Sequence, residues 1–395
     1  MNRTARGICI VAASALALTA CADDSGGGGS GGSADGEAIK LMVIESLTGA
    51  TGVDQTAPKA AEAAASSIND AGGVGGRDIE IVTCDTASDP NKATECARKA
   101  VSGGIVAVVG SFDPLGVAAS LPVLDAAGIP YVAPLAVFPS EYSSANSFPI
   151  TAGAPGANFG MVTAASDAGC KVVGTLGDTA IDQGQTEGLV AGLKAKGMDG
   201  YFVDLPTSTA DVTPVVAQLL EKDPDCIAYA ANGQVGVQIF SAVRRSGSDA
   251  QFISATGSML PPFIQALGAD AEGLIATTEN MAPDSPELKP FQDDMAKYQP
   301  DVQPVNFTLY GWYGVQTFAK AAEGLDEITP ESVTEALNGM DDLELPGQEP
   351  IDFTQTRDSE LFPRMFNTKI RYAKVENGAY VSSDDEWHDA GDVIP

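Results

Sequence analysis

The chain has little of the chemistry on which enzymes depend. Its 395 residues include one histidine, His388, within an acidic segment that also holds Trp387, Asp389 and Asp392. A Ser-His-Asp or Cys-His site would need this imidazole to return to a cleft. The sequence has no GxxxxGK[ST] phosphate loop, and the glycines of residues 72–76 have the wrong spacing for a dinucleotide fingerprint. We therefore expect neither an enzyme nor a cofactor.

Positive charge is also scarce. The chain has 22 Lys and Arg against 53 Asp and Glu, for a formal net charge of −31. An acidic surface repels phosphate backbones, so nucleic acid is excluded as a partner. This charge does not by itself identify a ligand. Beyond the first 20 residues no run approaches 18 uninterrupted apolar residues, so we expect no membrane-spanning helix there.

The first 20 residues have the pattern of an export signal. Arg3 and Arg6 precede an apolar stretch at residues 8–20, which is too short to span a bilayer. Leu18-Thr19-Ala20-Cys21 then resembles the lipobox of a bacterial lipoprotein, in which the cysteine is lipidated. The alternative is an ordinary cleaved signal peptide with an incidental cysteine. We expect residues 1–20 to be a lipoprotein signal peptide and Cys21 to be the lipidation site.

Residues 21–38 form a Gly/Ser-rich segment with no apolar face to bury. A coil of about 15 residues has a root-mean-square span of roughly 20 Å. It would therefore hold a folded body close to a membrane surface. We expect lipid anchoring to the cell membrane, on its extracytoplasmic face.

Four cysteines remain once Cys9 and Cys21 are assigned to the signal and the lipid. An even number in an oxidising compartment indicates two disulfides, with three possible pairings. Residue 84 ends a predicted strand and residue 96 lies in the following helix, whereas residues 170 and 226 each begin an apolar run. Neighbouring parallel strands would bring those two starts together, so we predict Cys84–Cys96 and Cys170–Cys226. No CxxC spacing or nearby histidine supports a metal site instead.

Short apolar runs alternate with helical segments from residue 39 onward. Such repeated βα units predict parallel sheets covered by helices on both faces. A body of about 360 residues exceeds one comfortable core, so we expect an α/β fold with two doubly wound parallel-sheet lobes. The predicted strands are 39–44, 79–84, 106–109, 131–133, 171–176, 200–203, 227–230, 252–255 and 369–375. The predicted helices are 57–70, 90–102, 114–127, 185–196, 212–221, 235–246, 306–324 and 330–338.

Four stretches in order carry a family resemblance. They are IKLMVIESLTG at 39–49, INDAGGVGGR at 68–77, DTASDPNKA at 85–93, and VVGS at 108–111 leading to AGIP at 127–130. Together they resemble the type I periplasmic binding proteins, in the leucine/isoleucine/valine-binding branch that serves ABC importers. The resemblance covers about residues 39–325.

The resemblance implies a bilobal fold joined by a three-strand hinge, with crossings near 149–151, 277–280 and 345–354. The first lobe would comprise 39–149 plus 280–345, and the second 150–279 plus 346–395. It also implies that a small solute, an amino acid or a related amide or amine, binds by lobe closure and passes to an ABC permease. The alternative is a lipoprotein that presents its solute to a membrane receptor for sensing.

The pocket departs from the family pattern. In amino-acid-binding relatives a serine and a threonine hold the ligand carboxylate, and a second-lobe glutamate holds its ammonium. The matching positions here are Pro114, Val137 and, less securely, Thr256, while Gln183 stands where a pocket tyrosine is expected. The polar anchors for an α-amino acid are therefore altered.

Asp113-Pro114 also has a structural interpretation, because Asp is a preferred helix N-cap and Pro suits the first helical position. Either way a carboxylate occupies a helix N-terminus that could otherwise meet a ligand anion. Our hypothesis is a solute that is not a standard branched-chain amino acid and is neutral, cationic or amide-like. Glu45, at the end of the first strand, could meet a cationic ligand or simply solvent.

The expected ligand-binding set comprises the carboxyl-end loops of both sheets and one residue of the later helix. These are Ser46, Thr48, Ser111, Phe112, Asp113, Pro114, Leu135, Ala136, Val137, Asp182, Gln183, Asn232, Gln234, Thr256 and Tyr310.

Overall fold

A computed structural model describes residues 36–49, 56–177, 185–206, 209–231, 233–383 and 386–395. These belong to one unit, Ala34–Pro395. Asp182, Gln183, Asn232 and Cys21 lie outside the described residues.

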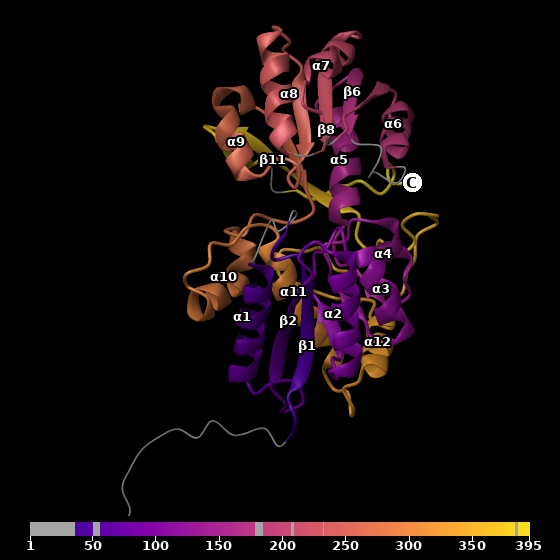
Figure 1. Cartoon of the computed structure of the whole chain (residues 1–395), viewed down its shortest axis with the longest axis vertical. Coiled ribbons are helices and arrows are strands. Elements are labelled where there is room, and N and C mark those ends of the chain that lie inside the picture. The colour runs from indigo at the N-terminus through magenta and orange to yellow at the C-terminus, as the bar shows by residue number, and fades with distance from the viewer. Residues whose placement is uncertain (1–35, 50–55, 178–184, 207–208, 232, 384–385) are drawn as a thin grey trace, which may run out of the picture. The chain divides into compact units, whose positions relative to one another are not determined.

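The first sheet has five parallel strands in the order β2-β1-β3-β4-β5. Their bounds are β1 (Ile39–Glu45), β2 (Ile79–Asp85), β3 (Ala107–Val109), β4 (Tyr131–Val132) and β5 (Ser147–Phe148). The helices on this sheet are α1 (Ala57–Asp70), α2 (Pro90–Ser102), α3 (Val117–Ala126), α4 (Pro139–Ser143), α10 (Lys289–Tyr298), α11 (Thr308–Ala322) and α12 (Pro330–Asn338). Figure 1 shows α1, in indigo, beside the orange α11, although the two are far apart in the chain.

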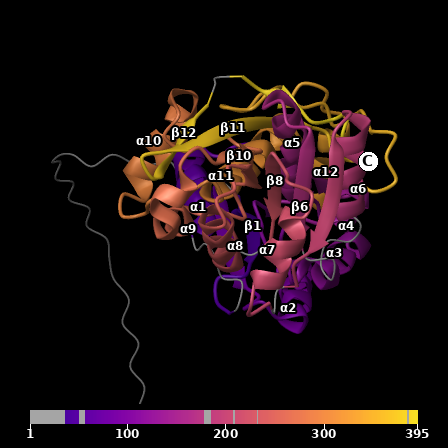
Figure 2. The same ribbon diagram turned by 90° about the horizontal axis from the view of Figure 1, so that it is seen from above.

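The second sheet runs β12-β11-β10-β9-β8-β6-β7, and β13 pairs with β11. Its bounds are β6 (Val172–Gly177), β7 (Asp199–Asp204), β8 (Cys226–Ala230), β9 (Gln251–Ala255), β10 (Ile275–Thr278), β11 (Lys369–Glu376), β12 (Ala379–Ser382) and β13 (His388–Asp389). Strands β6 to β10 are parallel, and β11 and β12 add an antiparallel edge. Figure 2 shows yellow β11 beside β10.

Five helices accompany the second sheet: α5 (Gly153–Asp167), α6 (Gln185–Ala195), α7 (Thr213–Leu220), α8 (Gly233–Arg245) and α9 (Pro261–Leu267). Two 3₁₀ turns complete the pattern, at Gly268–Ala271 and Pro286–Leu288. The two-lobed α/β fold expected from the alternating pattern is confirmed.

Turn and capping residues explain the helices whose ends match the expected residues. In α1, Pro58 stands at a first-turn position, and alanines fill the buried face. The helix ends before Gly72 and Gly73, whose positive φ angles turn the chain. Helix α12 begins with the Thr329 side chain accepting the Ser332 N–H, an N-cap that fixes its start.

Helix α11 is held closely against the first sheet. A side chain at Gly311 would meet the Ala57 carbonyl oxygen at 1.8 Å, and one at Gly110 the Tyr310 carbonyl oxygen at 2.4 Å. Trp312 and Phe318 are buried on this helix, and each contributes roughly 1.5–3 kcal/mol through apolar burial. The two glycines therefore permit a backbone approach that lets long side chains reach the core.

Two expectations need correction. Helix α3 was predicted from residue 114, but it begins at Val117 with Gly116 as its N-cap, because residues 114–116 form a turn. Helix α5 was not predicted at all: Gly153, Gly156 and Gly160 give its sequence a loop-like composition. The glycines suit close packing, since a side chain at Gly160 would meet Ile370 at 2.4 Å.

Three stretches join the elements of the first sheet to those of the second: one between β5 and α5, one after β10 and one before β11. Two core clusters meet near them: the first lies mainly under α1, α11 and α12, and the second under α5, α6 and β11. Ile150 packs with the first cluster and Ala152 with the second, and Thr277 to Asn280 are buried where β10 ends. Leu345, Ile351 and Phe353 pack with the first cluster, whereas Phe362 and Met365 pack with the second. The range 345–354, where the third crossing is expected, thus still packs with the first cluster.

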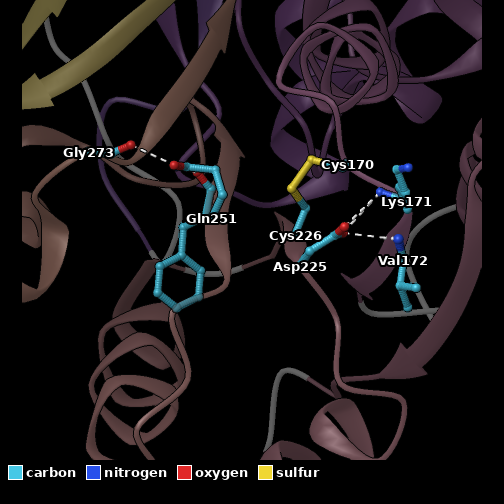
Figure 3. Close-up of a disulfide and its surroundings, with 8 residues drawn as sticks. Cys170, Lys171, Val172, Asp225, Cys226, Gln251 and Gly273 are labelled. Atoms are coloured by element: carbon cyan, nitrogen blue, oxygen red, sulfur yellow. Dashed lines mark hydrogen bonds between the residues drawn. A yellow bond between two sulfur atoms is a disulfide. The ribbon is translucent and has the colours of Figure 1, made fainter.

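Both predicted disulfides form. Cys84–Cys96 joins β2 to α2, and Cys170–Cys226 joins the amino ends of β6 and β8 with Cα atoms 5.9 Å apart. Asp225 beside the second bridge is the third member of a group with metal-ligand spacing. Figure 3 shows why this group is structural: the sulfurs are bonded to each other, and the carboxylate accepts the N–H groups of Lys171 and Val172 at 2.9–3.1 Å.

In the described ranges, no helix combines the length and apolar character needed to cross a lipid bilayer.

Candidate functional site

A pocket of about 320 Å³ lies at the carboxyl ends of strands from both sheets. From the first sheet it is lined by the turns after β3 and β4, and from the second by β6, β7, β8, α5 and α6. Its lining residues are Pro114, Leu115, Val137, Phe138, Asn158, Met161, Thr175, Leu176, Gly177, Gln185, Thr186, Leu189, Phe202, Ala228 and Ala230. Ligands of doubly wound sheets bind at such strand ends.

A larger hollow of about 680 Å³ lies elsewhere, among α1, α10, α11 and residues 344–350. Its walls all belong to elements packed on the first sheet, including Asp293, Trp312 and Lys320. It does not touch the carboxyl ends of the strands. We therefore take the smaller pocket as the candidate site.

Two of the altered family positions line this pocket. Pro114 and Val137 both contribute to its wall, and neither offers a side-chain hydrogen bond. Most lining residues from the second sheet and its helices were not expected from the sequence, above all Met161, Gly177 and Leu189. The carboxyl end of the predicted strand at 171–176 pointed to Gly177, but the missed helix α5 left Met161 without a signal.

Asp113 accepts backbone N–H groups in the turn that precedes α3. Its Oδ1 accepts the Gly116 N–H at 3.1 Å, and its carbonyl oxygen accepts the Val117 N–H at 2.9 Å. Burial raises the pKa of this carboxyl, the Thr86 hydroxyl and the Gly116 N–H lower it, and the Asp85 charge raises it. The capping role expected for Asp113 is therefore present, although the regular helix starts later.

Glu141 also accepts backbone N–H groups, at the start of α4. Its Oε2 accepts the N–H groups of Val137 at 2.8 Å and Phe138 at 3.0 Å. Burial raises the pKa of this carboxyl to about 7, against the lowering effect of those two N–H groups, and the Asp113 charge raises it further. Glu141 is 2 % exposed. At the helix starts after β3 and β4, these backbone N–H groups are thus bonded to the chain's own carboxylates.

Other expected residues have structural partners. The Ser111 hydroxyl accepts the Ile44 N–H at 3.0 Å, and the Ser46 hydroxyl is 2.6 Å from that of Ser88. Thr48 Oγ1 donates to Asp85 Oδ2 at 2.6 Å. The loops after β1, β2 and β3 are therefore tied to one another.

The remaining expected residues fall in three environments. Leu135 and Ala136 are buried in the loop after β4, Thr256 is half-buried after β9, and Gln234 is exposed in the first turn of α8. Phe112 stacks on Phe307 with ring centroids 5.5 Å apart.

Tyr310 lies in the hinge rather than the pocket. Its hydroxyl donates to Glu279 Oε1 at 2.8 Å and lies 3.0 Å from Thr151 Oγ1. Burial raises the pKa of the Glu279 carboxyl, and the Tyr310 hydroxyl lowers it. Glu45, at the end of β1, is buried near other carboxylates and is not exposed to solvent.

Two parallel-sheet lobes with a pocket at their strand ends define a two-lobed ligand-binding protein. The chain belongs to the periplasmic binding protein family, whose model matches residues 38–377. It is 27% identical over 289 residues to the Leu/Ile/Val-binding protein homolog 1 of Brucella melitensis, a match covering 71% of this chain and 76% of that one.

Solved structures share the fold. A fatty acid ABC transporter substrate-binding protein from Thermomonospora curvata superposes with a TM-score of 0.76 at 18% identity, covering 91% of this chain and 95% of that one. A branched-chain amino acid transporter substrate binding protein from Streptococcus pneumoniae, in complex with isoleucine, gives 0.72 at 21% identity, covering 89% and 100%.

Proposed function

We propose that this chain is the substrate-binding lipoprotein of an ABC importer, held by Cys21 on the extracytoplasmic face of the cell membrane. The lobes would capture a small solute by closing on it and present it to the permease. Family membership supports solute binding, and the names of the relatives point to transport of branched-chain amino acids.

The solute, we infer, is not a standard branched-chain amino acid. The observation that carries this inference is the occupation of the helix starts after β3 and β4 by Asp113 and Glu141. A ligand carboxylate there would lie near the Asp113 carboxylate and find these backbone donors already used. A neutral, cationic or amide-like solute avoids this repulsion.

Calorimetric titration with leucine, isoleucine and valine tests the solute class, and we expect no micromolar binding. Mass spectrometry of small molecules released from freshly purified protein would then identify what the chain carries. Micromolar binding of any of the three amino acids would refute the altered-solute proposal.

Loss of solute uptake in cells lacking this chain tests the importer role. Unchanged uptake together with loss of a transcriptional response to the solute would favour the sensing alternative. The Cys21→Ala variant should leave the membrane fraction, because stable anchoring depends on the acyl chains.

A further inference from the structure

The second-sheet half of the pocket is apolar. Met161 of α5, Leu176 of β6, Leu189 of α6 and Phe202 of β7 enclose it, and Ala228 and Ala230 of β8 add small side chains. Among the lining residues that the structure describes, none carries a charge.

Polar lining groups are largely engaged by the protein itself. The Thr175 hydroxyl donates to the Tyr201 carbonyl at 2.9 Å, and the Asn158 amide approaches Gln185 Oε1 at 3.5 Å. Both members of the amide pair are neutral, so they suit a neutral polar group at one end of a ligand. A charged group in this half would lose hydration and meet no charged side chain among the described lining residues.

Size limits the occupant. A volume of about 320 Å³ holds roughly ten water-sized groups, since a liquid water occupies about 30 Å³. That space matches a straight chain of six to eight carbons with a small head group.

We propose that this half-pocket between α5, α6 and β6 is an alkyl-chain subsite, which selects a solute with an uncharged head and a medium-length apolar tail. The proposal rests on the proposed solute-binding function and names its ligand class. Gly177 sets the depth of the subsite, because a methyl group there would contact Thr186 Oγ1 at 3.4 Å, the Ala230 carbonyl at 3.6 Å and Phe202 Cε2 at 3.6 Å. These are ordinary contact distances, so alanine at this position fills space without straining the strand.

Calorimetry of the purified full-length chain with butanamide, hexanamide and octanamide tests the subsite. Each added methylene should tighten binding about fourfold while the tail remains in the pocket. Hexanoate should bind at least tenfold more weakly than hexanamide. Equal affinity across the three amides, or tighter binding of hexanoate, would overturn the proposal.

Gly177→Ala should weaken octanamide binding at least tenfold, whereas Phe202→Leu should shift the preference toward longer amides by opening the wall. The matched control is Gly339→Ala, an exposed position after α12 with only ordinary contacts, where binding should not change. Octanamide binding that is identical in Gly177→Ala and the parent would place the tail elsewhere and overturn the assignment.

These results separate the subsite from the transport role. If an amino acid co-purifies with the chain and no amide binds, the subsite proposal fails while solute binding stands. If amides bind in a Gly177-dependent way and uptake in cells does not depend on the chain, the importer role fails and the subsite stands.

Discussion

Two buried carboxylates lie at the helix starts beside the pocket. Asp113 and Glu141 are buried, and each accepts backbone N–H groups at the start of a helical segment. The chain therefore supplies internally the negative charge that an external ligand would otherwise bring to these positions. Pro114 and Val137 line the pocket wall and offer no side-chain hydrogen bond there.

Glu141→Gln should flatten the dependence of stability on pH. Its folded-state pKa of about 7 exceeds the ordinary 4.5, so its contribution is fully present below pH 4.5 and lost as pH rises through 7. The amide oxygen of glutamine can still accept both N–H groups, because both go to one oxygen in the parent.

The parent should lose about 3 kcal/mol more unfolding free energy than Glu141→Gln between pH 4.5 and pH 8, measured by urea unfolding. The exposed Glu287→Gln serves as the control and should follow the parent. Parallel pH profiles for parent and Glu141→Gln would show that this carboxylate is not the titrating group.

At the scale of strands and helices, two disulfides cross-link the fold. One disulfide closes a separation of 12 residues between β2 and α2, and the other closes 56 residues between β6 and β8. In the chain-entropy model the longer loop gains more from cross-linking, because the unfolded chain loses more freedom.

Replacing Cys170 and Cys226 by alanine should cost about 4 kcal/mol of unfolding free energy, and replacing Cys84 and Cys96 about 3 kcal/mol. Denaturant unfolding of the two double variants under oxidising conditions measures the difference. A larger loss from the Cys84/Cys96 pair would contradict the loop-length argument.

At the scale of the whole molecule, the segments that connect the two lobes share a buried polar network. Tyr310 of α11 meets Thr151 of the first segment and Glu279 of the second, and Asn367 Nδ2 donates to the Ile150 carbonyl at 3.1 Å. The segments thus share hydrogen bonds although they are remote in sequence.

Tyr310→Phe should lower the unfolding free energy by about 1–3 kcal/mol, because it removes the side-chain donor of the buried Glu279 carboxylate. The loss should be larger at pH 8 than at pH 5, since the pKa of Glu279 is raised and its protonated form needs no donor. Unfolding curves at the two pH values measure this difference.

Tyr313→Phe is the matched control on the same helix. Its hydroxyl donates to the Pro346 carbonyl at 2.7 Å, so its loss should cost about 1 kcal/mol at both pH values. An equal pH response in the two variants would argue against a special role for Glu279.

Much of this architecture could be predicted from sequence because its signals are local. Apolar runs located β1, β2, β6 and β8, and the bounds expected for α1, α2 and α12 are the observed ones. Among the described residues, the expected set reaches the pocket wall at Pro114 and Val137, in loops that directly follow recognisable strands. Met161 and Glu141 escaped because glycines masked α5 and because a single glutamate gives no sign that it will fold back onto Val137 and Phe138.

The Cys170–Cys226 bridge stands at the amino ends of β6 and β8, whereas Gly177 and Ala230 line the pocket at their carboxyl ends. Six residues of strand separate the two by roughly 20 Å. The length of the strands therefore separates reduction of this disulfide from ligand binding in the pocket. A reducing environment would shorten the protein's lifetime while leaving the selectivity of the surviving folded molecules unchanged.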